Sequence, residues 1–504
     1  MAAFVNVQKN RMEKKKKSMK RTKIVCTMGP KTENVELLKE MIKSGMNVAR
    51  FNFSHGSHEE HAGRMALVEE ARKAVNIPVA TMLDTKGPEI RTGRFVGKHV
   101  VVKKGDKIVL EMGCEDANGN DKLGGKQDDG TILMGITYTG LIHDVNNGHH
   151  VRMDDGKLDM VVTGKDEAKG VIYCEATTND DIKDERGVNC PDTHLSMPYV
   201  SEQDRKDLIF GCEQHVNYCS ASFVRDKQDI DDIRKIFNEN GGKQIKIISK
   251  VENTEAIRNI DDVIKYSDGL MVARGDMGVQ IPAEDVPVVQ MRMIKGARKL
   301  GKPIVVATQM LDSMMHSPFP TRAEVSDVAN AVLSGADAVM LSGESANGDY
   351  PLESVTMQAK ICARMEKELD YEKLAKEGFA MSRRQEADAM ANAVVNAAYL
   401  TESKLIVCFS KYLESAKRLS HCRPVCPVLF ETSNHDAAYD SILYWGVYPA
   451  LVEKVPSSLK EMEAEAIALA KRYGIPAGSN IIVTGSDPVN SKDTNFMKIV
   501  TLEK

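Results

Sequence analysis

The stretch IKIISKVENTEAIRNIDDVIKYSDGLMVARGDMGVQIP, residues 245–282, contains two short apolar runs that each end abruptly in charge. The first run ends at Lys250 and Glu252, and the second ends just before Asp276. Residues two apart on a strand point to the same side, so Lys250 and Glu252 are expected to share one face. A cation and two carboxylates at adjacent strand ends suit a site that holds a divalent metal and a phosphate group.

The same alternation of an apolar run and a helix-like stretch recurs along the chain. The eight runs are residues 23–28, 46–53, 78–84, 215–223, 244–252, 267–276, 302–311 and 335–344. Strands that alternate with helices predict a parallel sheet, and eight such units predict a closed (β/α)8 TIM barrel. In that fold the functional residues lie at the carboxyl ends of the strands, which is where the polar residues of these runs occur.

Two further segments interrupt this pattern. About 130 residues separate the third run from the fourth, which is too long for one βα unit. Within this gap, residues 88–190 place Gly/Asp/Asn turn clusters between short Val/Ile runs, which predicts an inserted small β-barrel that covers the barrel mouth as a lid. Residues 361–504 predict a separate, open α/β domain with a possible effector site. The barrel itself is therefore expected from residues 21–87 and 191–360, after a basic flexible tail at residues 1–20.

The bulk composition fits a globular protein of several domains. The 68 Lys/Arg and 72 Asp/Glu residues give a formal net charge of −4, which implies no nucleic-acid partner. Residues 1–23 nevertheless hold nine Lys/Arg against Glu13, which indicates a solvated tail, with targeting or polyanion binding as the alternative. No run of about 18 apolar residues occurs, so no membrane span is expected. The 10 cysteines form no CxxC pair, which indicates reduced thiols in a cytoplasmic protein.

The strand-end motifs resemble those of the pyruvate kinase family, over nearly the whole chain from Arg21 to Val500. They are ARFNFSHG (49–56), LDTKGPEIRTG (83–93), IISKVENTE (247–255), MVARGDMGVQIP (271–282), VATQMLDSM (306–314) and the long stretch at 320–351. The resemblance implies transfer of the phosphoryl group of phosphoenolpyruvate to ADP, giving pyruvate and ATP. It also implies Mg²⁺ (or Mn²⁺) and K⁺ as cofactors, and a homotetramer.

The residues of the divalent-metal and phosphate site have distinct expected roles. Glu252 and Asp276 offer the hard oxygen ligands that Mg²⁺ requires. Lys250 is expected to stabilise the negative charge that spreads over a phosphoryl group in transfer. Arg50, at a strand end, offers fixed donors suited to phosphate oxygens, and the resemblance implies that contact.

A second group is expected around the enolate that phosphoryl transfer leaves behind. Gly275 lets the backbone approach the substrate, and the resemblance implies that Thr308 also contacts it. The enolate must then be protonated at carbon, and Thr308, Ser342 and Glu344 are candidates to orient a water or relay the proton. The sequence leaves open which group donates it.

The resemblance implies a potassium site formed by the oxygens of Asn52, Ser54, Asp84 and Thr85. A monovalent cation makes physical sense where two highly charged anions are brought together. Glu89 is the further sign of potassium, because family members with Lys at this position supply that positive charge themselves.

Nucleotide contacts follow from the same motifs. The resemblance implies Asn52, His55, Arg91 and Arg186, the last at a position where the family carries Lys. Two neighbouring histidines, His58 and His61, are interpreted as solvated helix residues.

The C-terminal domain departs from the family pattern for fructose 1,6-bisphosphate. In the loop that begins at Ser410, Leu413 replaces a glycine and Glu414 adds an anion where a phosphate is expected. The later loop 485–490 lacks the usual Trp-Arg. These changes predict weak or no activation by this bisphosphate, and leave another sugar phosphate, or no effector, open.

Two other hypotheses are compatible with parts of the pattern. One is a different metal-dependent barrel enzyme of enolpyruvate or oxaloacetate, a lyase or aldolase, which needs no ADP site. The other is a non-catalytic paralogue, which predicts the loss of at least one key residue. All five of those residues are present, namely Arg50, Lys250, Glu252, Asp276 and Thr308.

Overall fold

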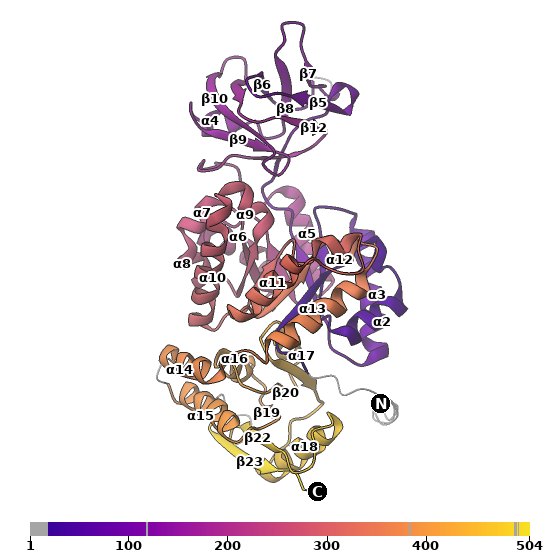
Figure 1. Ribbon diagram of the computed structural model, residues 1–504, viewed down its shortest axis with the longest axis vertical. Helices are drawn as coiled ribbons and strands as arrows, with labels where there is room; N and C mark the ends of the chain where they lie inside the picture. The colour runs from indigo at the N-terminus through magenta and orange to yellow at the C-terminus, as the bar shows by residue number, and fades with distance from the viewer. Residues whose placement is uncertain (1–18, 117–118, 383–384, 488–490, 492, 504) are drawn as a thin grey trace.

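The computed structural model forms three bodies, with a β-rich insert at one end, a barrel in the middle and an α/β domain at the other end (Figure 1). It describes residues 19–116, 119–382, 385–487, 491 and 493–503, so most of the predicted basic tail lies outside the described part. No helix in these ranges combines the length and the apolar character needed to cross a bilayer.

A closed barrel of eight parallel strands confirms the predicted fold class. In order around the barrel the strands are β1 (Lys23–Thr27), β2 (Val48–Asn52), β3 (Ala80–Asp84), β14 (Tyr218–Ala221), β15 (Lys246–Val251), β16 (Gly269–Ala273), β17 (Ile304–Ala307) and β18 (Ala338–Leu341). Each lies inside one of the eight apolar runs. The strands are buried on both faces, as expected for a parallel sheet covered by helices. Their register pairs Asn52 with Asp84, so the ends of β2 and β3 meet at one rim.

Helices cover the outside of the barrel and end where the sequence provides caps. The main ones are α2 (Val35–Ser44), α3 (His58–Val75), α5 (Glu202–Glu213), α6 (Lys227–Glu239), α8 (Ile260–Tyr266), α10 (Val286–Leu300), α11 (Arg322–Leu333) and α13 (Pro351–Met365). Helix α3 begins at a capping box between Ser57 and Glu60 and ends at Asn76 in the left-handed conformation. The short helices α7 (Thr254–Arg258), α9 (Arg274–Gln280) and α12 (Gly343–Ala346) follow strands directly at the mouth.

The insert between β3 and β14 is a β body with a core of its own. Its main sheet has the order β4 (Ile90–Arg91), β13 (Gly187–Asn189), β9 (His150–Met153), β10 (Leu158–Asp166), β11 (Val171–Ala176), β6 (Lys107–Met112), β8 (Ile132–Ile136) and β7 (Gly125–Lys126). Strands β5 (His99–Val102) and β12 (Asp180–Lys183) form a second, antiparallel pair. Leu110, Met134 and Leu158 are completely buried within it, which explains how the insert keeps its shape outside the barrel.

The C-terminal domain is an open α/β sheet, as predicted. Its order is β21 (Val447–Leu451), β20 (Val428–Thr432), β19 (Ile406–Phe409), β22 (Asn480–Gly485) and β23 (Phe496–Thr501), of which only β23 runs antiparallel. Its helices are α14 (Tyr371–Met381), α15 (Glu386–Leu400), α16 (Leu413–His421), α17 (His435–Asp440) and α18 (Leu459–Arg472).

The floor of the barrel is closed by the turn that follows α17. Ile442 and Leu443 are almost fully buried and join the cluster of apolar side chains inside the strands. The Tyr218 hydroxyl donates to the backbone oxygen of Asp440 at 2.8 Å and accepts from the Leu443 N–H at 3.3 Å. The C-terminal domain thus seals the amino end of the barrel, which leaves the carboxyl end as the mouth for a site.

Candidate active site

A buried network of charges lies at the carboxyl ends of β2, β3 and β15. The Lys250 Nζ lies 2.9 Å from Glu252 Oε1 and 3.3 Å from Asp84 Oδ1. Asp84 Oδ2 accepts a hydrogen bond from Arg50 Nε at 2.7 Å. Lys250 also donates to the Ser222 hydroxyl at 2.9 Å. Two cations and two carboxylates therefore alternate in a space where all four side chains are at least nine-tenths buried.

The pKa values in this network show that the lysine is held charged. Burial alone disfavours an ammonium, but Asp84 and Glu252 outweigh it and raise the pKa of Lys250 above its usual value. Burial likewise opposes the Asp84 carboxylate, yet Arg50 and Lys250 lower its pKa below the ordinary value. Glu252 differs: burial, reinforced by the nearby Asp276 and opposed by Lys250, raises its pKa to about 8. A second positive charge near Glu252 and Asp276 would offset the repulsion between these two carboxylates and the cost of burying Glu252.

The pair of carboxylates Glu252 and Asp276 fits a metal ion. Glu252 is completely buried, and its Oε2 accepts the Phe223 N–H at 2.7 Å. Asp276 stands in the first turn of α9 and is half-buried. The described residues contain no group of three or more His, Cys, Asp or Glu side chains arranged for a metal. Glu252 and Asp276 therefore suit a cation that keeps water or substrate oxygens as its other ligands, as Mg²⁺ does.

Thr308 stands in a strained turn directly after β17. Its φ is 67°, and Gln309 follows at 53°, a region that a β-branched residue rarely adopts. Arg274 holds this turn: it donates to the Thr308 carbonyl at 2.7 Å and pairs with Asp327 at 2.6 Å. The Thr308 hydroxyl accepts the Gly275 N–H at 2.8 Å. The ends of β16 and β17 are thus fixed to each other, and Thr308 is presented beside Gly275 and Asp276.

The residues predicted for a monovalent cation gather at the ends of β2 and β3. Asn52 and Asp84 are register partners, and Ser54 follows Asn52 with its N–H directed to the Asn52 side-chain oxygen at 3.3 Å. Thr85 is almost fully buried, and its carbonyl accepts the Ser222 hydroxyl at 2.5 Å. The structure thus brings side-chain and backbone oxygens of all four residues to one part of the rim.

A cleft of about 280 Å³ lies between the insert and the barrel mouth. Four of the predicted site residues line it, namely His55, Arg91, Arg186 and Asp276. Arg91 lies 2.7 Å from Glu89 and donates to the Glu185 carbonyl at 2.8 Å. Arg186 Nε lies 3.5 Å from Asp154 Oδ1, and both residues line the cleft from the insert.

The interpretation of His61 as a solvated residue was wrong, whereas His58 is half-buried with 31% of its side chain exposed. His61 is only 1% exposed and stacks on Phe53, with ring centroids 4.1 Å apart. Its Nε2 lies 2.9 Å from the His55 carbonyl oxygen, and burial lowers its pKa. His58 stacks on Phe210 and lies 2.6 Å from Asp207. Helix α3 therefore packs its first turn by aromatic contacts, and His61 fixes the loop that carries His55.

Ser342 and Glu344 lie at the end of β18. The Glu344 carboxylate accepts the N–H groups of Ser342 at 2.7 Å and Leu311 at 3.1 Å, which ties this loop to the one after β17. Burial raises its pKa. The Ser342 hydroxyl is buried and has no hydrogen-bond partner among the described residues.

Three contacts at the mouth were not foreseen. Ser222 hydrogen bonds to both Lys250 and Thr85. In the sequence, only its position at the end of an apolar run could have indicated a place in the site. The sequence places Arg274 next to Gly275, but it does not indicate that Arg274 hydrogen bonds to the turn after β17. Arg152 of the insert donates to the Val279 carbonyl, so the insert rests on α9.

Comparisons with known proteins agree with this architecture. Residues 19–355 match the family model of the pyruvate kinase barrel domain, and residues 388–500 match that of the pyruvate kinase alpha/beta domain. A pyruvate kinase of Clostridium acetobutylicum is 40% identical over 487 residues, covering 96% of this chain and 100% of that protein. One of Geobacillus stearothermophilus is 40% identical, covering 95% of this chain and 80% of that protein. A crystal structure of a Cryptosporidium parvum pyruvate kinase aligns with a TM-score of 0.87 at 35% identity, over 96% of each chain.

Proposed function

The chain belongs to the pyruvate kinase family and is a phosphotransferase, and we propose how its own residues carry the phosphoryl group from phosphoenolpyruvate to ADP. The observation that carries the proposal is Lys250, buried yet held charged between Asp84 and Glu252. An ammonium placed in advance, in a site with little water, stabilises the charge on a phosphoryl group without reorganisation. Arg50, fixed on Asp84, offers its remaining donors to the same group.

Magnesium, or manganese, is the divalent cofactor that Glu252 and Asp276 would hold. When bound, such an ion supplies positive charge beside the phosphoryl and carboxylate oxygens of the substrate. The two carboxylates position it at the wall that also carries Lys250. The raised pKa of Glu252 supports this role, because a buried carboxylate that lies near a second acid, Asp276, is stabilised by a further cation.

Potassium is the second cation of the proposal, held by Asn52, Ser54, Asp84 and Thr85. Glu89 supports this assignment, because it adds no positive charge to the cleft and is itself paired with Arg91. A monovalent cation at the ends of β2 and β3 would balance the charge of two anionic substrates.

The nucleotide is proposed to lie in the cleft under the insert, against Asn52, His55, Arg91 and Arg186. Arg91 and Arg186 belong to the insert, whereas His55 belongs to the barrel. A nucleotide held from both sides would draw the insert over the mouth as a lid and exclude water from the transfer.

Protonation of the enolate is assigned to the side of the mouth that carries Thr308. The strained turn presents the Thr308 hydroxyl toward Gly275, where the substrate is expected. Ser342, whose hydroxyl has no partner among the residues that the structure describes, is the candidate that orients a water there. Glu344 would act by holding the Ser342 backbone.

The assembly is proposed to be a cytoplasmic homotetramer. Exposed apolar side chains on the edge strand β23, Met497 at 38% and Ile499 at 45%, support contact between C-terminal domains. An analytical ultracentrifugation run that gives only monomer would contradict this part.

A coupled assay of ATP formation tests the central role of Lys250. Lys250→Met should lower turnover by about three orders of magnitude while phosphoenolpyruvate binding largely persists. Lys246→Met is the matched control, because Lys246 stands at the other end of β15 and pairs with Asp440 at 3.1 Å. Near-normal turnover of the Lys250 variant would overturn the assignment.

A further inference from the structure

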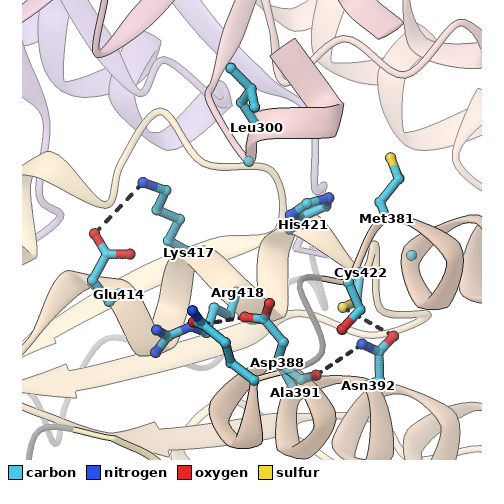
Figure 2. Close-up of a pocket in the computed structure, with 14 residues that line it drawn as sticks. Leu300, Met381, Asp388, Ala391, Asn392, Glu414, Lys417, Arg418, His421 and Cys422 are labelled. Atoms are coloured by element: carbon cyan, nitrogen blue, oxygen red, sulfur yellow. Dashed lines mark hydrogen bonds and ion pairs between the residues drawn. The ribbon is translucent and has the colours of Figure 1, made fainter. Parts of the chain in front are cut away.

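A second, smaller cavity lies where the barrel meets the C-terminal domain (Figure 2). Its volume is about 50 Å³, and its walls come from Leu300 at the end of α10, from Gly301 directly after it, and from α14, α15 and α16. It shares no lining residue with the active cleft. By this measure one water needs roughly 10–15 Å³, so the cavity has room for one compact oxyanion.

The floor of this cavity consists of groups that are already engaged with one another. Asn392 donates to the Asp388 carbonyl at 2.9 Å, and the Cys422 thiol points to the Asn392 side-chain oxygen at 3.6 Å. Arg418 donates to Asp388 and to Asp493, each at 3.1 Å. Asn392 and Cys422 are 7% and 5% exposed. The polar groups of the floor are therefore held in place by hydrogen bonds to one another and to Asp493.

One face of α16 places two basic side chains, Lys417 and His421, at the cavity. Lys417 and His421 are four residues apart and so share a face, which Figure 2 shows turned toward Leu300. Gly301 is at φ 63°, and a Cβ at this position would lie 3.0 Å from the His421 ring nitrogen Nδ1. The absence of a side chain on Gly301 thus makes room for the imidazole between the two domains.

The ion pair of Lys417 is loose. Its Nζ lies 3.6 Å from Glu414 Oε1, beyond ordinary hydrogen-bond length, and Glu414 is 53% exposed. Exposed pairs of this kind contribute little stability. A ligand with stronger acceptor oxygens can therefore replace Glu414 as the partner of Lys417.

We propose that this cavity binds the phosphate group of a small monophosphate. Lys417 and His421 donate to its oxygens, the Arg418 guanidinium lies beneath them, and the rest of the molecule leaves past the exposed Gln385 and Glu414. Leu300 and Gly301 belong to the barrel, whereas the donors belong to the C-terminal domain, so the bound anion links the two bodies. Glu414 competes with the ligand for Lys417. Removing the charge of Lys417 should therefore weaken phosphate binding, and removing the charge of Glu414 should strengthen it.

The experiment is a titration of the full-length protein with inorganic phosphate, in which the midpoint temperature of thermal unfolding is measured at each phosphate concentration. The wild type should be stabilised, and Lys417→Met should weaken the apparent phosphate affinity about tenfold, because it removes a charge-assisted hydrogen bond. Glu414→Gln should strengthen it about threefold, because the competing carboxylate is gone. Lys411→Met, an exposed lysine of the same domain outside the cavity, should respond as the wild type does.

The quantity compared between variants is the rise in the unfolding midpoint that phosphate causes, so a change in a variant's midpoint without phosphate does not matter. Phosphate bound in the active cleft adds the same rise in every variant. His421→Gln provides an independent second variant and should also weaken the response. A sugar monophosphate should act like phosphate, and a dicarboxylate of similar size should not. Equal responses of wild type and Lys417→Met, a weaker response of Glu414→Gln, or an equal effect of the dicarboxylate would each overturn the proposal.

Discussion

The barrel and the C-terminal domain both end parallel strands in buried carboxyl groups, but the two ends differ in how the charge is balanced. At the barrel mouth Asp84 lies between Arg50 and Lys250. At the end of β20, Glu431 is 1% exposed, and its Oε2 has no hydrogen-bond partner among the described residues. Burial, aided by Glu465 and opposed by Arg472, raises the pKa of Glu431 to about 8. Cations beside a buried carboxylate favour its ionised form, and the barrel mouth provides two of them for Asp84.

The same contrast applies to the hydroxyl groups of the two ends. In the C-terminal domain Ser410, Ser415 and Thr494 hydrogen bond to one another at 3.1 and 2.9 Å. At the mouth, Ser222 accepts a hydrogen bond from the charged Lys250, and the Ser342 hydroxyl has no hydrogen-bond partner in the described part of the chain. Polar groups that satisfy each other stabilise a fold, whereas a buried hydroxyl without a partner costs stability and is a candidate to bind a water or a substrate.

The largest expected effect breaks the charge balance at the mouth. Glu252→Gln removes a carboxylate proposed to hold the divalent metal and leaves Lys250 with one partner fewer. Turnover should fall by about three orders of magnitude, and the Mg²⁺ concentration for half-maximal rate should rise. Glu239→Gln is the control, since Glu239 ends α6 in an exposed pair with Arg205, outside both the buried network and the cleft. Unchanged Mg²⁺ dependence of the Glu252 variant would contradict its role as a ligand.

Removal of potassium should produce the next largest effect. In a buffer with tetramethylammonium as the only monovalent cation, the wild-type rate should drop about tenfold to a hundredfold, because the charge of two anions is left unbalanced. Glu89→Lys should restore much of the rate without potassium by placing an ammonium in the cleft. A wild type with full activity in this buffer would refute the potassium site.

Arg274 tests whether the strained turn depends on its support. Arg274→Met removes the donors that hold the Thr308 carbonyl and the pair with Asp327, so the turn is expected to relax to an unstrained φ. We expect turnover to fall about tenfold to a hundredfold with a smaller change in stability. Arg292→Met is matched to it, because Arg292 lies on nearby α10 in a loose, exposed pair with Asp261. If both variants lose turnover equally, the support model is wrong.

Most of the fold was predictable because its signals are local. Each barrel strand lies in a short apolar run with polar residues at its end, as with Lys250 near the end of β15 and Glu252 directly after it. The contacts of Ser222 and Arg274 were not predictable, because each reaches across to a neighbouring strand end. The burial of His61 was missed for a similar reason: its partner Phe53 lies in the turn after β2, and the polar sequence of the first helical turn does not indicate this contact.

Glu431 gives a smaller effect, seen in stability. A carboxyl whose pKa is higher in the folded state than its ordinary 4.5 contributes most when protonated, so its stabilisation is lost as the pH rises toward about 8. The free energy of unfolding should therefore fall by up to about 1.4 kcal/mol per pH unit in this window from this group. Glu431→Gln should flatten the dependence between pH 6 and 8, measured by denaturant titration. A variant with the wild-type slope would show that Glu431 is ionised in the fold.

The smallest expected effect concerns fructose 1,6-bisphosphate. Glu414 stands in the first turn of α16, where a phosphate would otherwise meet free N–H groups, and Leu413 fills the position of a glycine. The Ser410 and Ser415 hydroxyls are already bonded to each other. We therefore expect the half-saturating phosphoenolpyruvate concentration to change less than about twofold when the bisphosphate is added, since repulsion by one carboxylate offsets the helix end. Glu414→Gln with Leu413→Gly should raise the response, whereas strong activation of the wild type would mean that the C-terminal sheet end, despite its closed hydroxyls, accepts a dianion.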